Sequence, residues 1–116
     1  MAMQAPSARA ELPTSPCATS DVDNLSFTSR DPEGRIRWWD VTPPKTDYWH
    51  VHEMLGRAYA FEFIDLIQEK DKKLSKHTFG FIASEIVRQG RTMNDGLYFG
   101  FFCAISEYLI EGRVSR

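Results

Sequence analysis

The sequence predicts an α+β fold that is mainly helical, with an N-terminal β-hairpin packed on a three-helix unit. Two observations lead to this prediction. Two short segments with a period-two alternation of side chains flank a turn signal near Asp31, which favours a hairpin over 24–41. Three later segments, 47–69, 75–89 and 94–111, carry apolar residues three and four positions apart, the pattern typical of amphipathic helices.

The first 23 residues are expected to form a flexible tail. They consist largely of Ala, Ser, Thr, Pro and Gln, with almost no large apolar side chains. Such a segment cannot bury enough surface to offset the entropy of ordering. We therefore expect a single domain over 24–116, which is long enough to hold a hydrophobic core without a metal or a disulfide. The start of the chain lacks the pattern of a secretory signal, which favours a cytoplasmic protein.

The hairpin is predicted by the run Asp31-Pro32-Glu33-Gly34. Asp opens such a turn with its side chain, Pro presets the backbone at the second position, and Gly eases the exit at the fourth. The alternation places Leu25 and Phe27 on one face of the first strand, and Trp38 and Trp39 on opposite faces of the second. Because an isolated hairpin is only marginally stable, we expect it to lie on helices or to pair with another chain.

Capping residues and glycine indicate where the helices begin and end. Thr46 or Asp47 can cap the first helix, and Thr92 or Asn94 can cap the third. Gly90 is placed to follow the last residue of the second helix. The third helix is apolar nearly all round, so we expect it to be buried on more than one side.

Two of the predicted helices share a short pattern, GRAYAF at 56–61 and GLYFGF at 96–101. Both contain small residues four positions apart, a spacing that lets two helices approach closely. A duplicated helical unit would explain the similarity. Two copies fall short of a repeat array, however, so we interpret the pattern as chance similarity between aromatic-rich helices.

Charge and length exclude several classes of protein. The net charge of −2 is spread evenly along the chain, without the basic balance of a protein that holds nucleic acid or anionic lipid mainly by charge. The most apolar run, from Leu97 to Ile110, is shorter than the roughly 20 residues that a membrane span needs. We therefore expect no membrane association.

The sequence contains no motif of a known catalytic or cofactor site. It has no glycine-rich phosphate loop, no G-x-S-x-G and no C-x-x-C. His50 and His52 are two residues apart on a predicted helix and point away from each other, which excludes a shared metal ion. Cys103 lies in an apolar helix, where its thiolate is suppressed. We expect no cofactor, no metal and no enzymatic activity; a site near His52, with Tyr59 and Glu62, is the enzymatic alternative.

The chain has more aromatic side chains than one small bundle can cover, with eight Phe, four Tyr and three Trp. Several of them fall on the outward sides of the predicted helices, an excess that is typical of an association surface. We therefore predict a small protein–protein interaction, adaptor or regulatory protein that forms a homodimer and contacts another protein. The residues predicted to form the interaction surface are Phe81, Phe99, Cys103, Ile110, Trp38 and Trp39.

A nucleic-acid-associated regulator is the second alternative. Lys70, Lys72, Lys73 and Lys76 form a basic turn that could contact an anion such as phosphate. In a helix-turn-helix, however, the second helix must offer basic or amide side chains to the bases. The third predicted helix has none between its start and Arg113, so nucleic-acid binding is not favoured.

Overall fold

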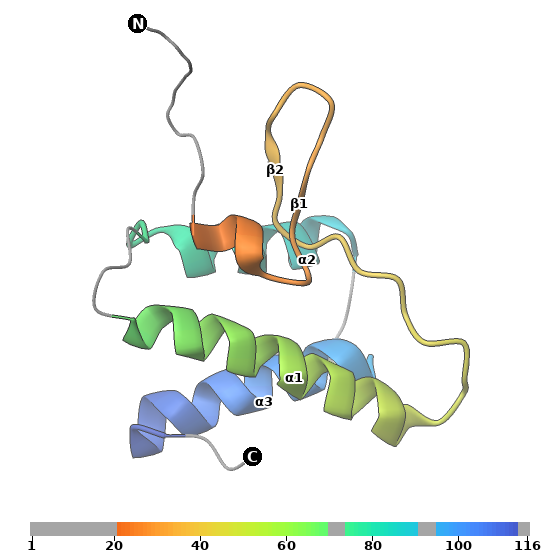
Figure 1. The fold of residues 1–116 in the computed structure, drawn as a ribbon. Helices are drawn as coiled ribbons and strands as arrows, with labels where there is room; N and C mark the ends of the chain where they lie inside the picture. The colour runs from red at the N-terminus through yellow and green to blue at the C-terminus, as the bar shows by residue number, and fades with distance from the viewer. Residues whose placement is uncertain (1–20, 70–73, 91–94, 114–116) are drawn as a thin grey trace, which may run out of the picture.

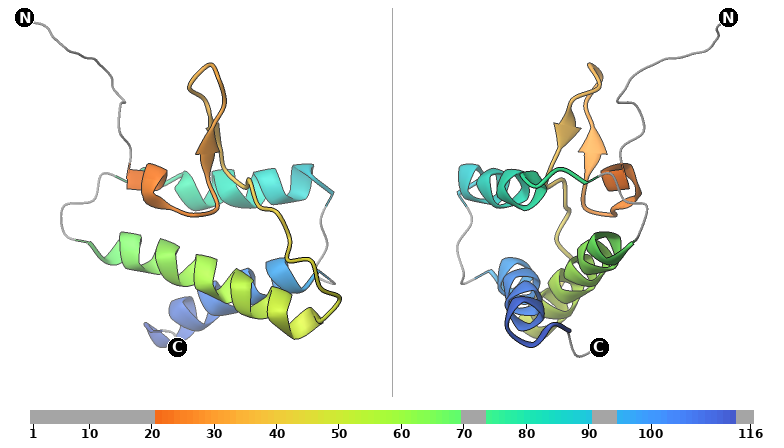
Figure 2. Two further views of the ribbon diagram at one scale, coloured as in Figure 1. Left: turned by 45° about the vertical axis from the view of Figure 1, so that its right-hand side comes forward. Right: turned by 90° about the vertical axis from the view of Figure 1, so that its left-hand side faces the viewer.

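The computed structural model describes residues 21–69, 74–90 and 95–113, and it confirms the predicted fold class (Figure 1). A two-stranded antiparallel hairpin precedes three helices that pack together. Helices α1 and α3 run in the same direction, and α2 runs back in the opposite direction on the side of the hairpin (Figures 1 and 2). The elements are a 3-10 helix η1 (Asp21–Asn24), strands β1 (Ser29–Arg30) and β2 (Ile36–Arg37), and helices α1 (Trp49–Gln68), α2 (Thr78–Arg88) and α3 (Gly96–Glu111).

The hairpin turn forms at the predicted residues. The Asp31 side chain accepts hydrogen bonds from the backbone N–H of Arg35 at 2.8 Å and of Glu33 at 2.9 Å. Gly34 has a φ of 87°, a conformation that residues with a side chain rarely adopt. The carboxylate of Asp31 therefore holds the turn, and glycine allows the chain to leave it.

The strands are much shorter than the predicted span of 24–41. Strands β1 and β2 contain two residues each. Before β1 the chain turns instead of extending, because the carbonyl of Val22 accepts from the N–H of Leu25 at 3.1 Å and from the Thr28 hydroxyl at 2.7 Å. Local hydrogen bonds of this kind compete with a sheet ladder. Leu25 and Phe27 are buried, but they reach the core from this turn and not from a strand.

Asp31→Ala is expected to loosen the hairpin, because it removes the acceptor of two backbone hydrogen bonds. These bonds, that of Arg35 first, lower the pKa of Asp31 below its ordinary value of 3.8. A carboxyl with a lowered pKa stabilises the fold above its unfolded pKa, and this contribution is lost as the pH falls through the folded pKa. Amide NMR shifts of the turn should therefore change below about pH 4. Asp31→Asn, which keeps an acceptor but does not titrate, should abolish that change; an identical titration in this variant would contradict the assignment.

The first helix starts later than predicted and with a different cap. Helix α1 begins after Tyr48, whose side chain makes no capping hydrogen bond. The predicted cap Thr46 lies two residues before the N-cap Tyr48, and its hydroxyl accepts from the N–H of Tyr48 at 3.2 Å. Neither Thr46 nor Asp47 is therefore the cap.

The other helix ends agree with the sequence in part. Gly90 follows α2 with a φ of 76°, as predicted. Helix α3 is capped by Asp95, whose carboxylate accepts from the N–H of Leu97 at 3.0 Å. The predicted caps Thr92 and Asn94 lie outside the described residues. Helices α2 and α3 therefore end at a glycine, whereas several neighbouring polar residues can serve as a start.

Helices α1 and α3 cross in backbone contact at glycines. A Cβ atom at Gly56 would collide with the backbone of Leu97, and one at Gly100 would collide with the backbone of Glu53. A Cβ atom at Gly96 would lie 2.8 Å from the carbonyl oxygen of Trp49, a less severe collision. Gly56 thus makes room for the backbone of the GLYFGF segment, and Gly96 and Gly100 make room for the part of α1 that precedes GRAYAF. Beyond the crossing the two helices separate toward their C-terminal ends (Figure 1).

Five aromatic side chains fill the space between the hairpin and the α1–α3 crossing. Phe27 and Trp39, which flank the hairpin, are 0% and 3% exposed. Their ring centroids lie 5.2 Å apart, and each ring lies within 5.5 Å of Phe101. Trp39 also contacts Tyr59 and Tyr98. We call these five residues the aromatic core, since they join the hairpin to two helices.

Candidate interaction surface

Helix α3 has two apolar sides, as its composition indicates. One side is buried against α1 and the aromatic core. The other side carries Phe99, Cys103 and Ile110. Phe99 and Cys103 are half-buried, and Ile110 is 79% exposed. The question for this side is therefore which neighbouring groups already cover it.

Helix α1 covers this side of α3 in part. The Trp49 ring lies 5.3 Å from the Phe99 ring at an interplanar angle of 49°. Further along, the Arg57 guanidinium donates to the Glu107 carboxylate at 3.0 Å and 3.4 Å. The same guanidinium lies over the Phe61 ring, 5.6 Å from its centroid, within cation–π distance. The two helices therefore share one surface with an ion pair at its middle.

Groups on both helices act on the pKa of Arg57. The hydrogen bond to Glu107 raises the pKa of Arg57, and Glu53 and Cys103 add to the rise. Cys103 precedes Glu107 by four residues on α3, so the two side chains lie on the same side of that helix. We call the combined surface the outer strip. Its members are Trp49, Phe61, Phe99, Cys103 and Ile110, with the Arg57–Glu107 ion pair.

The remaining predicted surface aromatics lie elsewhere. Trp38 and Phe81 stack with their ring centroids 5.2 Å apart and an interplanar angle of 28°. This pair joins the end of the hairpin to α2, so it is separate from the outer strip. Phe81 is 46% exposed. Trp39 belongs to the aromatic core and not to an exposed surface, because successive residues of an extended segment point to opposite sides.

The residues of the predicted enzymatic alternative are not brought together. His52 Nε2 lies 2.7 Å from the carbonyl oxygen of Thr46. Tyr59 packs in the aromatic core, where burial raises its pKa. Glu62 accepts from the N–H of Ser26 at 2.7 Å. His52 and Glu62 are separated by about 15 Å along α1. Within the described ranges there is also no group of three or more His, Cys, Asp or Glu that could hold a metal ion.

Of the four lysines in the predicted basic turn, the structure describes only Lys76. Lys70, Lys72 and Lys73 lie outside the described residues. Lys76 is exposed just before α2, where it lines an apolar cavity between the three helices. The sequence does not indicate this cavity, because its walls come from three helices whose separation depends on the crossing angle of α1 and α3.

Comparison with known protein families, with characterised proteins and with solved structures finds no match for this chain. None of the helices in the described part of the chain has the length and apolar character needed to cross a membrane.

Proposed function

We propose that this is a non-enzymatic interaction protein that forms a homodimer through the outer strip. The observation that carries the proposal is that the strip is continuous across α1 and α3. Trp49 and Phe99 lie at one end and Ile110 at the other, around the Arg57–Glu107 ion pair. Aromatic residues and Arg are enriched at protein interfaces, and covering adjacent apolar groups is favourable.

The charge pattern of the strip supports a second copy as the partner. The strip carries a cation, Arg57, beside an anion, Glu107. In a twofold-symmetric dimer the same patch serves both protomers. A twofold axis near this ion pair brings the Arg57 of one protomer toward the Glu107 of its partner, so the two identical strips attract each other.

Ile110→Glu is expected to weaken the dimer by about tenfold or more, because it places a carboxylate in an apolar interface. Ile110 is largely exposed in the single chain, so the variant should fold normally. Phe99→Glu should act in the same direction. Val87→Glu is the matched control, since Val87 on α2 is 72% exposed and lies outside the strip. Size-exclusion chromatography with light scattering measures the masses; a wild-type chain that remains monomeric when concentrated would contradict the proposal.

Charge reversal tests the symmetry of the interface. Arg57→Glu or Glu107→Arg alone places like charges within one strip and across the twofold axis, so each should lower the dimer fraction. The double variant restores opposite charges at positions 57 and 107, both within one protomer and between the two protomers. It should therefore recover the dimer. A double variant as weak as the single variants would argue against a twofold arrangement around this ion pair.

A further inference from the structure

Helix α2 is held against α1 and α3 by apolar side chains. Ile82 and Ile86 of α2 are buried in the core. Phe79 of α2 packs against Phe63 of α1 and Phe102 of α3, with ring centroids 6.0 Å and 6.2 Å apart. Among the described residues, no hydrogen bond or ion pair joins α2 to either of these helices.

The contact between α1 and α3 is of a different kind. The two backbones meet at Gly56 and Gly100. The Arg57–Glu107 ion pair joins the same helices further along. A Cβ atom at Gly80 of α2, in contrast, would have nothing within 4 Å, so no other backbone approaches α2 there. The contacts that hold α1 to α3 therefore do not depend on α2.

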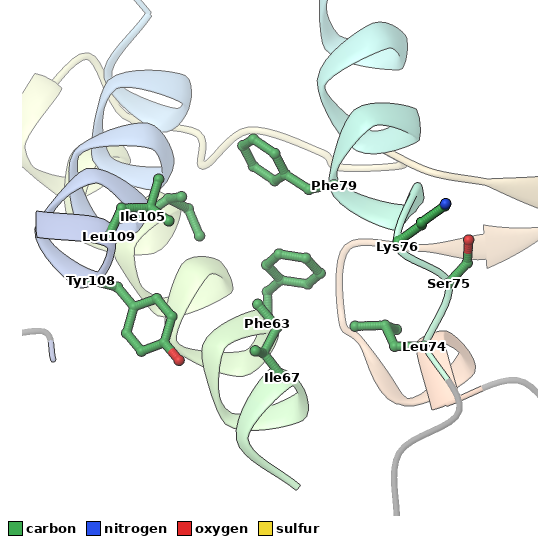
Figure 3. A pocket seen from close by; sticks show the side chains of 9 residues that line it. All are labelled: Phe63, Ile67, Leu74, Ser75, Lys76, Phe79, Ile105, Tyr108 and Leu109. Atoms are coloured by element: carbon green, nitrogen blue, oxygen red, sulfur yellow. The ribbon is translucent and has the colours of Figure 1, made fainter. Parts of the chain in front are cut away.

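An apolar cavity of about 370 Å³ lies between the start of α2 and the C-terminal halves of α1 and α3 (Figure 3). Phe79 lines it from α2, Phe63 from α1 and Ile105 from α3. The walls of a cavity lose the dispersion contacts that a close-packed neighbour would provide. The first turn of α2 is therefore packed less tightly than the part that carries the buried isoleucines.

Two further contacts join α2 and its C-cap to the segment that follows β2. The ring of Phe81 stacks on the ring of Trp38, with centroids 5.2 Å apart. The side-chain amide of Gln89 donates to the carbonyl oxygen of Trp39 at 2.8 Å. Phe81 is 46% exposed, so this stack lies at the surface of the molecule. Separating α2 from the rest thus breaks one hydrogen bond, one surface stack and the apolar contacts described above.

We propose that α2 opens as a separate unit while α1 and α3 remain packed together, and that this opening exposes an apolar surface. The surface consists of Phe63, Phe102 and Ile105, which pack against α2 or line the cavity beside it. Elements with few contacts open at a lower free energy than the whole protein. The opening is distinct from the proposed dimer, because no residue of the outer strip belongs to α2. The protein thus has a second apolar surface whose exposure depends on the position of α2.

Amide hydrogen exchange of the full chain, followed by NMR at low urea concentrations, tests this proposal. An isolated helix of 11 residues is marginal in water, so the amides of α2 exchange when it opens. The protection factors of Ile82 and Ile86 should be lower by about tenfold or more than those of Ile64 on α1 and Ala104 on α3. They should also depend less on urea, because opening exposes less surface than unfolding. One shared protection factor and one urea dependence for all four amides would overturn the proposal.

Two substitutions between alanine and glycine separate opening from unfolding. Ala58→Gly, at an exposed position of α1, should lower the protection of the α1 and α3 amides by about two- to fivefold. It should leave the α2 amides unchanged, because α1 stays folded when α2 opens. Gly80→Ala should raise the protection of all three helices, because it stabilises α2 against both opening and unfolding. If Ala58→Gly lowers protection equally in α1 and α2, then α2 opens only when the protein unfolds, and the proposal is wrong.

Discussion

Gly100→Ala is expected to destabilise the protein by about 3 kcal/mol or more, at the upper end of the cost of overpacking a core. The added methyl group would collide with the backbone of Glu53, and a backbone cannot move aside by changing rotamer. The two helices would have to separate, and this would weaken the packing of the aromatic core between them and the hairpin. Gly56→Ala should have a similar effect, because its methyl group meets the backbone of Leu97.

Urea denaturation followed by circular dichroism measures this difference, and Gly80→Ala is the control. Gly80 lies inside α2, and a Cβ atom there has nothing within 4 Å. Alanine is the better helix former, so Gly80→Ala should stabilise the protein by about 0.5–1 kcal/mol. The same Gly→Ala substitution should thus stabilise the protein on α2 and destabilise it on α3. If Gly100→Ala is as stable as the wild type, the close crossing of α1 and α3 is incorrect.

Trp39→Ala is expected to cost about 3–5 kcal/mol, the range for truncating a buried large aromatic residue. Trp39 is 3% exposed and contacts four other aromatic rings, so its loss leaves a cavity between the hairpin and the helices. Trp39→Phe should cost much less. The buried indole Nε1 of Trp39 has no hydrogen-bond partner among the described residues, so this substitution removes no hydrogen bond.

Trp49→Ala is the matched control for this prediction. Trp49 is 45% exposed and lies against the ring of Phe99 near the surface. Its removal should lower the free energy of unfolding by about 1 kcal/mol or less, as is usual for surface substitutions. Urea denaturation of the three variants measures these values. Equal costs for Trp39→Ala and Trp49→Ala would contradict the assignment of Trp39 to the aromatic core.

The local features of the fold could be predicted from the sequence because each depends on a few neighbouring residues. The turn at Asp31–Gly34 requires only its own side chains, and Gly90 stops α2 through its own backbone conformation. The helices follow from the spacing of apolar residues. The α+β class follows from these elements together.

The features that depend on distant contacts were missed or misjudged. Leu25 and Phe27 have the alternation of a strand, but the hydrogen bonds to Val22 turn the chain there. The spacing of the small residues in GRAYAF and GLYFGF indicates that each helix can be approached closely, but it does not indicate that these two helices cross each other there. The exposed fraction of Trp39 depends on where α1 and α3 lie, and this cannot be read from the hairpin alone.

The candidate surface was predicted in part. The sequence groups Phe99, Cys103 and Ile110 on one side of their helix, and the structure places them there. It does not indicate that Arg57 and Glu107, fifty residues apart, form an ion pair within the same surface. The cavity beside Lys76 was missed for the same reason, since its walls meet only in the folded chain.

Sedimentation velocity of the wild-type chain over a wide range of concentration tests the proposed homodimer most directly. We expect the mass to rise from one chain to two as the concentration increases, and to change little with added salt, because apolar contacts contribute most of the interface. A complex with nucleic acid would instead weaken steeply with salt. A mass that stays at one chain throughout the range would contradict the proposal.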